Sequence, residues 1–206
     1  MVSSFKKIAD EKLQPDSFEF NKENKKKALE VMKNYPKNYL ESSIMPLLSL
    51  AQEQFGGWIP KKAMEHISQF LNVSEMKVLE LATFYSMYNL SPIAENHIEI
   101  CTTTPCMLRG AEKILEKCKK KLNLDVGEYN KNKKFSLVEV ECLGACVNAP
   151  MLQLNEDYYE DLDPTKLEQI IDKISNDEVP QPGSYRGRLS SEPENTRKTL
   201  IGNKNA

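Results

Sequence analysis

The sequence predicts an α+β protein, in which an N-terminal helical bundle precedes a compact α/β domain. Up to about residue 95, apolar residues recur at the three- and four-residue steps of amphipathic helices. From His97 they alternate as in β-strands, and helical spacing then returns in two later segments. A chain of 206 residues has room for one ordinary domain with a helical extension, which excludes a large multidomain enzyme. We expect a helical domain over residues 1–95, an α/β domain over residues 96–176 and an extended tail over residues 177–206.

Four helices are expected in the first domain. They cover residues 24–34, 44–55, 60–71 and a segment that begins after Ser74. The second helix should end at Gly56-Gly57. Ser74 is a typical N-cap, with Val73 and Val78 spaced as a hydrophobic staple. We expect the aromatic group of Phe84, Tyr85 and Tyr88, which continues the fourth helix, to lie in the core.

The expected order of elements in the second domain is strand, helix, strand, strand, helix. Ile98 and Ile100 mark the first strand, and residues 107–122 the helix that follows. Further strands are expected at 135–141, 151–154 and 158–160, the last two as a hairpin. Asp163-Pro164 then provides an N-cap followed by proline at the first helical position. After residue 176 the prolines, glycines and polar residues have little to bury, so the tail should become ordered only against a partner.

Charge and composition exclude several classes of protein. Lysine and arginine number 28 and aspartate and glutamate 30, and this near balance argues against a nucleic-acid footprint. The longest charge-free runs, 81–94 and 142–155, are too short for a membrane span. The first eleven residues lack the apolar run of a signal peptide, so we expect a cytoplasmic chain or one already processed. Only two histidines are present, which leaves little material for a His-rich metal site or a Ser-His-Asp triad.

The chemistry is expected in the cysteines, all five of which lie between residues 101 and 146. Cys101 and Cys106 are separated by four residues, and Cys142 and Cys146 by three. Each pair follows a predicted strand, so two loops at one end of a sheet could place four sulfurs around one inorganic centre. Gly144 allows the backbone of the second loop to approach closely, and Arg109 could temper negative charge there.

The nature of that centre stays open on spacing alone. Four thiolates around an oxidised two-iron core leave a net charge of about −2, and N–H donors in the loops would help to hold an added electron. The spacing favours iron-sulfur, but a structural zinc accepts similar spacings. Disulfides fit poorly in a chain with no export signal. A thiol-disulfide enzyme would ordinarily carry a Cys-x-x-Cys pair, and this chain has none.

Cys118 is interpreted differently. It shares an apolar helical stripe with Leu108, Ala111, Leu115 and Leu122, as a buried structural thiol would.

Several sequence segments resemble one family closely. The segments CTTTPCMLRGAEKI, VEVECLGACVNAPML and YYEDL are similar to the thioredoxin-like 2Fe-2S subunit of respiratory complex I, the NADH:ubiquinone oxidoreductase. The upstream strings FGGWIP and LELATFYSMYNLSP resemble its helical region, and PQPG and GRLSSEP resemble its tail. The resemblance covers about residues 20–190. It implies a thioredoxin-like domain over residues 96–176, with Cys101, Cys106, Cys142 and Cys146 as the ligands of one 2Fe-2S cluster.

The resemblance also implies a partner and a place. In that family the subunit lies against a flavoprotein subunit that binds FMN and NADH, within the peripheral arm of the complex. The cluster is close to the flavin and holds an electron transiently. The chain would then be peripheral on the cytoplasmic face of a bacterial inner membrane, or on the matrix side if it is a processed mitochondrial chain. Related subunits of NAD-linked hydrogenases and formate dehydrogenases share the cysteine pattern and remain an alternative, as does a zinc-stabilised interaction module.

Two features suggest how such a partner would be contacted. Trp58 follows two glycines, so it could either present a rigid aromatic side chain to a partner or close the helical bundle. Tyr185, Arg186 and Arg188 could wrap a neighbour when the tail becomes ordered. We therefore expect the helical domain and the tail to anchor the chain to its partner.

Overall fold

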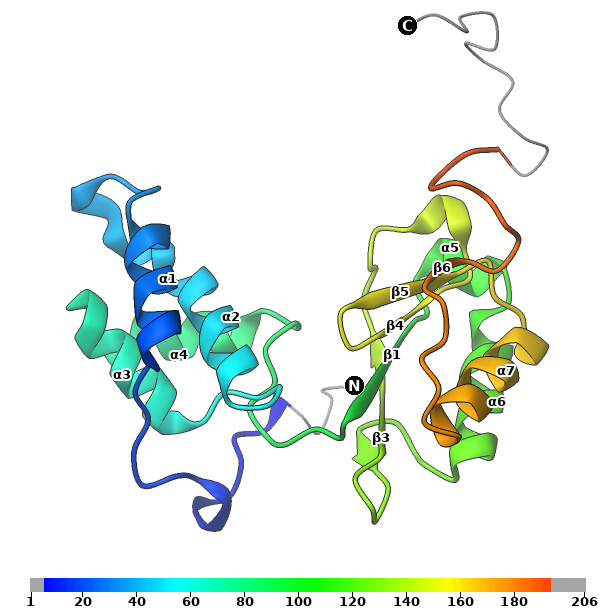
Figure 1. The fold of residues 1–206 in the computed structure, drawn as a ribbon, viewed down its shortest axis with the longest axis horizontal. Helices are drawn as coiled ribbons and strands as arrows, with labels where there is room; N and C mark the ends of the chain where they lie inside the picture. Colours follow the sequence, from blue (N-terminus) through cyan, green and yellow to red (C-terminus); the bar gives the residue numbers. More distant parts are fainter. Residues whose placement is uncertain (1–5, 194–206) are drawn as a thin grey trace, which may run out of the picture. The chain divides into compact units, whose positions relative to one another are not determined.

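A helical unit and an α/β unit follow one another along the chain, and the division falls between Ile93 and Ala94 (Figure 1). The computed structural model describes residues 6–193. Among the helices within those residues, none has both the length and the apolar character needed to cross a bilayer. Each unit has its own buried core.

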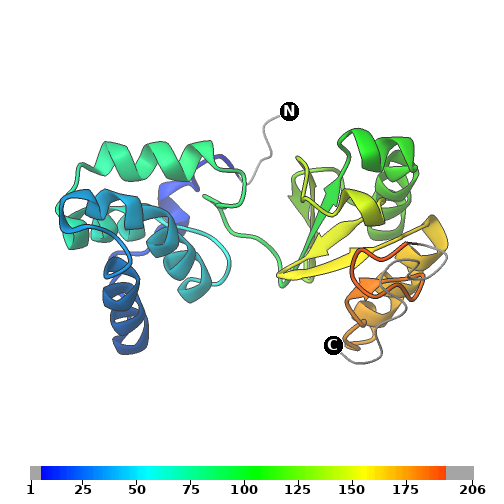
Figure 2. The same cartoon turned by 90° about the horizontal axis from the view of Figure 1, so that it is seen from above.

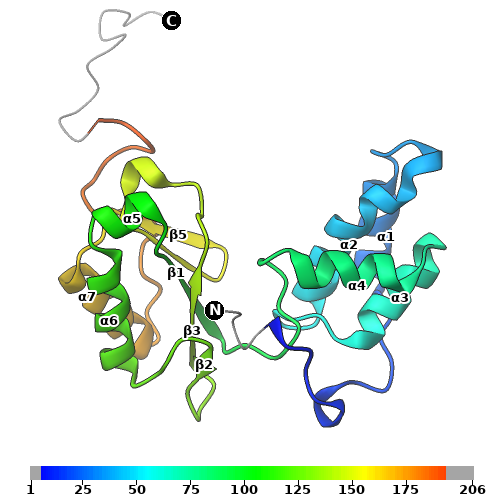
Figure 3. The same ribbon diagram turned by 180° about the vertical axis from the view of Figure 1, so that it is seen from behind.

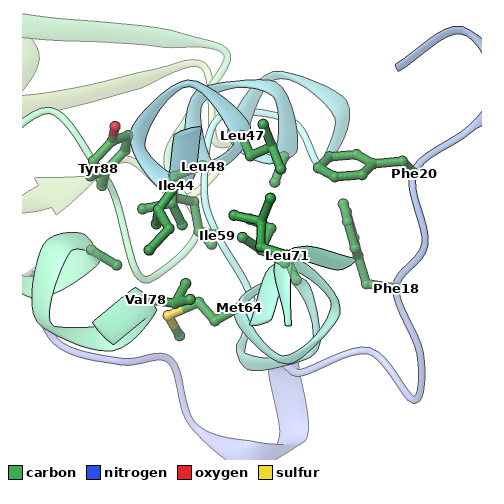
Figure 4. Close-up of a cluster of buried hydrophobic side chains, with 14 of the residues drawn as sticks. Phe18, Phe20, Ile44, Leu47, Leu48, Ile59, Met64, Leu71, Val78 and Tyr88 are labelled. Atoms are coloured by element: carbon green, nitrogen blue, oxygen red, sulfur yellow. The ribbon is translucent and has the colours of Figure 1, made fainter. Parts of the chain in front are cut away.

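Four α-helices form the first unit. They are α1 (Lys22–Met32), α2 (Ile44–Gln54), α3 (Lys61–Leu71) and α4 (Glu75–Phe84). Their apolar faces meet in one cluster (Figure 4), which includes Leu47, Leu48, Met64 and Val78 and is joined by Phe20 from the segment before α1. The predicted cap of α4 is confirmed, because the Ser74 side chain accepts a hydrogen bond from the N–H of Met76. A 3₁₀ segment, Lys37–Ser43, precedes α2 and was not predicted.

One aromatic prediction in this unit needs correction, and one alternative that the sequence left open is decided. Phe84 is 79% exposed, whereas Tyr88 is fully buried and its hydroxyl donates to the carbonyl oxygen of Met45. The reason is that α4 ends at Phe84 and Tyr85 is extended, so the helical periodicity does not continue through the aromatic group. Trp58 is only 6% exposed and packs edge to face against Phe55, with ring centroids 5.1 Å apart. It is therefore part of the packed interior and does not stand out from a turn as a docking side chain.

A six-stranded mixed sheet forms the frame of the second unit. In spatial order the strands are β2 (Glu128–Tyr129), β3 (Phe135–Val140), β1 (Asn96–Cys101), β4 (Leu152–Leu154), β5 (Asp157–Glu160) and β6 (Gly183–Ser184). The predicted hairpin is confirmed as the antiparallel pair β4–β5. Strands β2 and β6, which have two residues each, were not predicted. The central pair, β1 and β3, is parallel, with Cys101 opposite Val140.

The described part of this unit has three α-helices: α5 (Thr104–Leu108), α6 (Ala111–Leu122) and α7 (Pro164–Ser175). The predicted single helix over residues 107–122 is wrong, because Gly110 adopts a left-handed conformation, with φ of 95°, and separates α5 from α6. Leu108 is consequently 76% exposed and not part of the buried stripe. Helices α6 and α7 lie side by side on one face of the sheet (Figures 2 and 3), joined by the ion pairs Lys117–Glu168 and Lys121–Asp172.

The segment after α7 contacts earlier parts of its own chain as far as Ser190, which corrects the expectation that it orders only on a partner. Strand β6 pairs with β5, and Tyr185 packs against the α/β core. The Arg188 guanidinium pairs with the carboxylate of Asp161, and the two side chains are 9% and 1% exposed. Sequence reasoning missed this packing because the segment has few apolar residues and its partners lie far away in the chain. Residues 194–206 of the predicted tail lie outside the described residues.

Candidate metal centre

The topology brings the two cysteine loops to one edge of the sheet. Cys101 ends β1 and Cys106 lies in α5, while Cys142 follows β3 and Cys146 opens a 3₁₀ helix, Cys146–Asn148. Because β1 and β3 are parallel and in register, their carboxyl ends meet at the same edge. All four predicted site residues are therefore neighbours there, although 35 residues separate the two pairs in sequence.

Within this edge the sulfurs are arranged as loop-mate pairs. The Sγ atoms of Cys142 and Cys146 lie 3.4 Å apart. The thiols of Cys101 and Cys106 share a hydrogen bond, and Cys101 interacts electrostatically with both members of the other pair. Within residues 6–193, no group of three or more His, Cys, Asp and Glu side chains is arranged to hold a metal ion. The assignment of the four cysteines as one ligand set thus remains a proposal.

The two pairs differ in burial. Cys101 and Cys106 are each 1% exposed and belong to a small apolar cluster with Ala111, Ala149 and Met151. Cys142 and Cys146 are both exposed. A centre held by the four sulfurs would therefore have one side embedded in the protein and the other open to the surface.

Hydrogen-bond donors favour one thiolate in each pair. Burial opposes ionisation of Cys101, but the Thr103 hydroxyl at 3.3 Å and the N–H groups of Leu143 and Thr103 outweigh it and lower the Cys101 pKa. The N–H of Gly144, 3.4 Å from the sulfur, lowers the pKa of Cys142. The left-handed φ of 86° at Gly144 allows the backbone to turn in this way.

The second thiol of each pair resists ionisation. Burial and the adjacent Cys101 raise the pKa of Cys106 to about 12. In the other pair, the adjacent Cys142 raises the pKa of Cys146. Each pair accommodates one negative charge readily, and the second thiolate requires a positive centre nearby. Four cysteines in this state suit a positively charged metal centre, since iron-sulfur clusters and structural zinc are both held by cysteine thiolates.

Leu143 connects the two loops. Its N–H donates to the sulfur of Cys101, and its carbonyl oxygen accepts a 2.8 Å hydrogen bond from the hydroxyl of Tyr158. Thr103 and Tyr158 thus shape the site, although no local pattern in the sequence indicates a role for either residue. Both lie in segments quoted for the family resemblance, which was the only signal available. Arg109 is exposed at the junction of α5 and α6, and its predicted tempering of charge stays a prediction.

Cys118 lies away from these loops, in α6. Its side chain is fully buried in the α/β core, and burial raises its pKa to about 12. The prediction of a buried structural thiol is confirmed.

Fold and site together define a class: a thioredoxin-like α/β layer with two cysteine loops where its parallel strands end. The sequence model of the thioredoxin-like [2Fe-2S] ferredoxin family matches residues 28–175. The chain belongs to this family, whose members carry a 2Fe-2S cluster.

Individual relatives extend this match. The E subunit of NADH-quinone oxidoreductase from Rickettsia bellii is 53% identical over 161 residues, which is 78% of this chain and 96% of the relative. NADH dehydrogenase [ubiquinone] flavoprotein 2, mitochondrial, of Dictyostelium discoideum is 44% identical over 184 residues, 89% of this chain and 74% of the relative. Among solved structures, an NAD+-reducing [NiFe]-hydrogenase in the air-oxidized state superposes with a TM-score of 0.54. It is 18% identical, and the match covers 63% of this chain and 23% of the hydrogenase chain, so it supports the fold alone.

Proposed function

We propose that this chain is the electron-transfer subunit of an NADH:quinone oxidoreductase, and that Cys101, Cys106, Cys142 and Cys146 hold its single 2Fe-2S cluster. The observation that carries the proposal is that the two cysteine loops meet at one edge of the sheet. The chain is also about half identical to a bacterial NADH-quinone oxidoreductase subunit, over nearly the whole length of that relative. The cluster, when bound, takes up one electron and returns it.

The residues around the site have separate tasks in this proposal. Cys101 and Cys106, embedded in the apolar cluster, would anchor the inner side of the cluster. Cys142 and Cys146 would hold its outer side, at the surface where an electron enters and leaves. The Thr103 hydroxyl and the N–H groups of Leu143 and Gly144 donate toward sulfur and stabilise the added negative charge.

The proposed partner is a flavoprotein subunit that binds FMN and NADH. Within residues 6–193 the chain has no glycine-rich loop between a strand and a helix start of the kind that holds a dinucleotide, so NADH would be oxidised on the partner. The chain would then be a peripheral subunit, on the cytoplasmic or matrix side of its membrane. The alternative, that the chain is the corresponding subunit of an NAD-linked hydrogenase, is less well supported, because the similarity to the hydrogenase structure rests on 18% sequence identity.

The test is a spectrum of the whole chain purified without air. We expect a reddish protein with about two irons and two sulfides per chain and a paramagnetic signal on reduction. A colourless protein with one zinc per chain would contradict the proposal and favour the zinc-stabilised module.

A second measurement tests the division of labour with the partner. The pure, flavin-free chain should not oxidise NADH, whereas the complex with the flavoprotein should. NADH oxidation by the pure chain would refute the assignment of the nucleotide site to the partner.

A further inference from the structure

The C-terminal segment Gly183–Glu192 passes beside the end of the second cysteine loop, where it contacts the residues that directly follow Cys146 (Figure 1). The carbonyl oxygen of Val147 accepts a hydrogen bond of 3.1 Å from Nη2 of Arg188. The side-chain amide of Asn148 donates to the carbonyl oxygen of Ser190 at 2.9 Å. These partners lie 41 and 42 positions apart in the chain, so the contacts are tertiary.

Asp161 completes the attachment from a third direction. Its carboxylate accepts hydrogen bonds from Nε of Arg188 at 2.9 Å and from the hydroxyl of Ser184 at 2.6 Å. Its own N–H donates to the carbonyl oxygen of Asn148 at 2.8 Å. Three hydrogen-bonded contacts therefore link Val147 to Arg188, Arg188 to Asp161, and Asp161 to Asn148. The peptide bond between Val147 and Asn148 closes them into a ring immediately after Cys146.

The side chains of three of the four residues in this ring, Arg188, Asp161 and Asn148, are buried, although Val147 and Cys146 are not. The side chains of Arg188 and Asp161 are 9% and 1% exposed, and Asn148 is 2% exposed. Cys146 and Val147 lie at the surface, where few packing contacts could determine the position of the sulfur. A guanidinium that binds Asp161 and the Val147 carbonyl together is a rigid fork that a flexible ammonium would not reproduce.

We propose that Arg188 is a positioning residue for Cys146, and that the segment Gly183–Glu192 holds the outer side of the cluster site in place. The inference rests on the proposed function, because it takes Cys146 as a ligand. Arg188 acts through the carbonyl of Val147 and through Asp161, as residues around metal ligands do when they orient the ligands.

The experiment compares variants of the whole chain with the cluster bound. Arg188→Met removes every donor and keeps an unbranched stem. The double variant Asp161→Asn with Arg188→Met also removes the unpaired buried carboxylate that the single change leaves behind, so it guards against simple misfolding. Arg186→Gln is the charge control, since it removes the same charge from an exposed side chain two residues away that acts on Asp161 through longer-range charge. Ile174→Ala, in the α/β core, lowers stability without changing the loop contacts.

Three readouts are needed: the rate at which an iron chelator bleaches the visible absorbance, the line shape of the reduced cluster's paramagnetic signal, and the thermal midpoint. We expect both Arg188 variants to lose iron about 10- to 100-fold faster, the range typical of residues that support metal ligands, and to show a broadened signal. Arg186→Gln should match the wild type. Ile174→Ala should melt at a lower temperature and keep the wild-type signal.

Two results would overturn the inference. One is wild-type iron release and line shape in the double variant. The other is equally fast release from Ile174→Ala at a matched loss of thermal stability, which would reduce Arg188 to general support of the fold. A wild-type chain that binds no two-iron cluster would instead defeat the proposed function. In that case amide hydrogen exchange over residues 144–148 decides whether Arg188 holds the loop, because exchange there should be faster in the double variant and unchanged in Arg186→Gln.

Discussion

The hydroxyl of Tyr158 lies 2.8 Å from the carbonyl oxygen of Leu143, and the N–H of the same Leu143 donates to the sulfur of Cys101. One residue of the second cysteine loop is thus tied to β5 on one side and to the first cysteine on the other. The relative position of the two loops depends on this link as well as on the parallel pairing of β1 with β3.

Tyr158→Phe should loosen that link without removing any ligand. The half-buried Leu143 carbonyl loses its donor, so we expect a stability loss of about 1 kcal/mol and faster release of the cluster. Chelator-driven bleaching and a denaturant titration measure the two effects. Tyr129→Phe, an exposed tyrosine of β2, is the control. Equal bleaching rates for Tyr158→Phe and the wild type would show that the link has no role in holding the site.

Replacement of the cysteines by serine should separate ligands from bystanders. Serine at 101, 106, 142 or 146 should each abolish or badly distort the paramagnetic signal of the reduced cluster, because a thiolate ligand is lost. Cys118→Ser should leave the signal intact and cost stability, since a hydroxyl replaces a fully buried thiol in the core. Loss of the cluster in Cys118→Ser would overturn the ligand assignment.

Asp163 provides a test of pH dependence at the start of α7. Its carboxylate accepts from the N–H groups of Thr165 and Lys166, both at 2.9 Å. Partial burial opposes ionisation, but these donors and the Lys166 side chain outweigh it, so the pKa of Asp163 lies below its usual value. The stabilisation is therefore present above the usual aspartate pKa of about 3.9 and is lost as the pH falls through the lowered value.

Asp163→Ala should accordingly cost about 1 kcal/mol at neutral pH, the ordinary cost of losing an N-cap. The difference from the wild type should shrink as the pH falls below about 4. Denaturant unfolding at pH 7 and at acid pH measures both values. A difference that is constant across this range would mean that the charged form of Asp163 contributes nothing to the cap.

The helical unit before Ala94 is proposed to anchor the chain to the proposed flavoprotein partner, because the α/β unit has a complete core of its own. A fragment that begins at Ala94 should keep its cluster spectrum and fail to co-purify with the flavoprotein. It must extend through the segment Gly183–Glu192, since an end at residue 176 would remove Arg188 from the site. Binding of this fragment with full-length affinity would place the docking surface on the α/β unit.

Local patterns in the sequence predicted most of the elements. The stripes of α2 and α3, the Ser74 cap and the β4–β5 hairpin each depend on contacts between residues close in the chain, and such contacts leave a regular trace in composition. Gly110 shows the opposite case. A glycine inside a helical stripe is compatible with one helix or two, and only its left-handed backbone divides α5 from α6.

The sequence by itself determined the candidate ligands, two cysteine pairs of fixed spacing that each lie at the end of a strand, and it predicted that Cys118 is a buried thiol. The tertiary structure decided how they meet and what holds them. The parallel pairing of β1 with β3 brings the two loops to one edge of the sheet. The hydroxyl of Tyr158 binds the carbonyl of Leu143, and the Arg188–Asp161 pair lies beside the chain that follows Cys146. These contacts join residues far apart in the chain, and hydrophobic periodicity reports only which face of an element is buried, not which distant polar group lies opposite it.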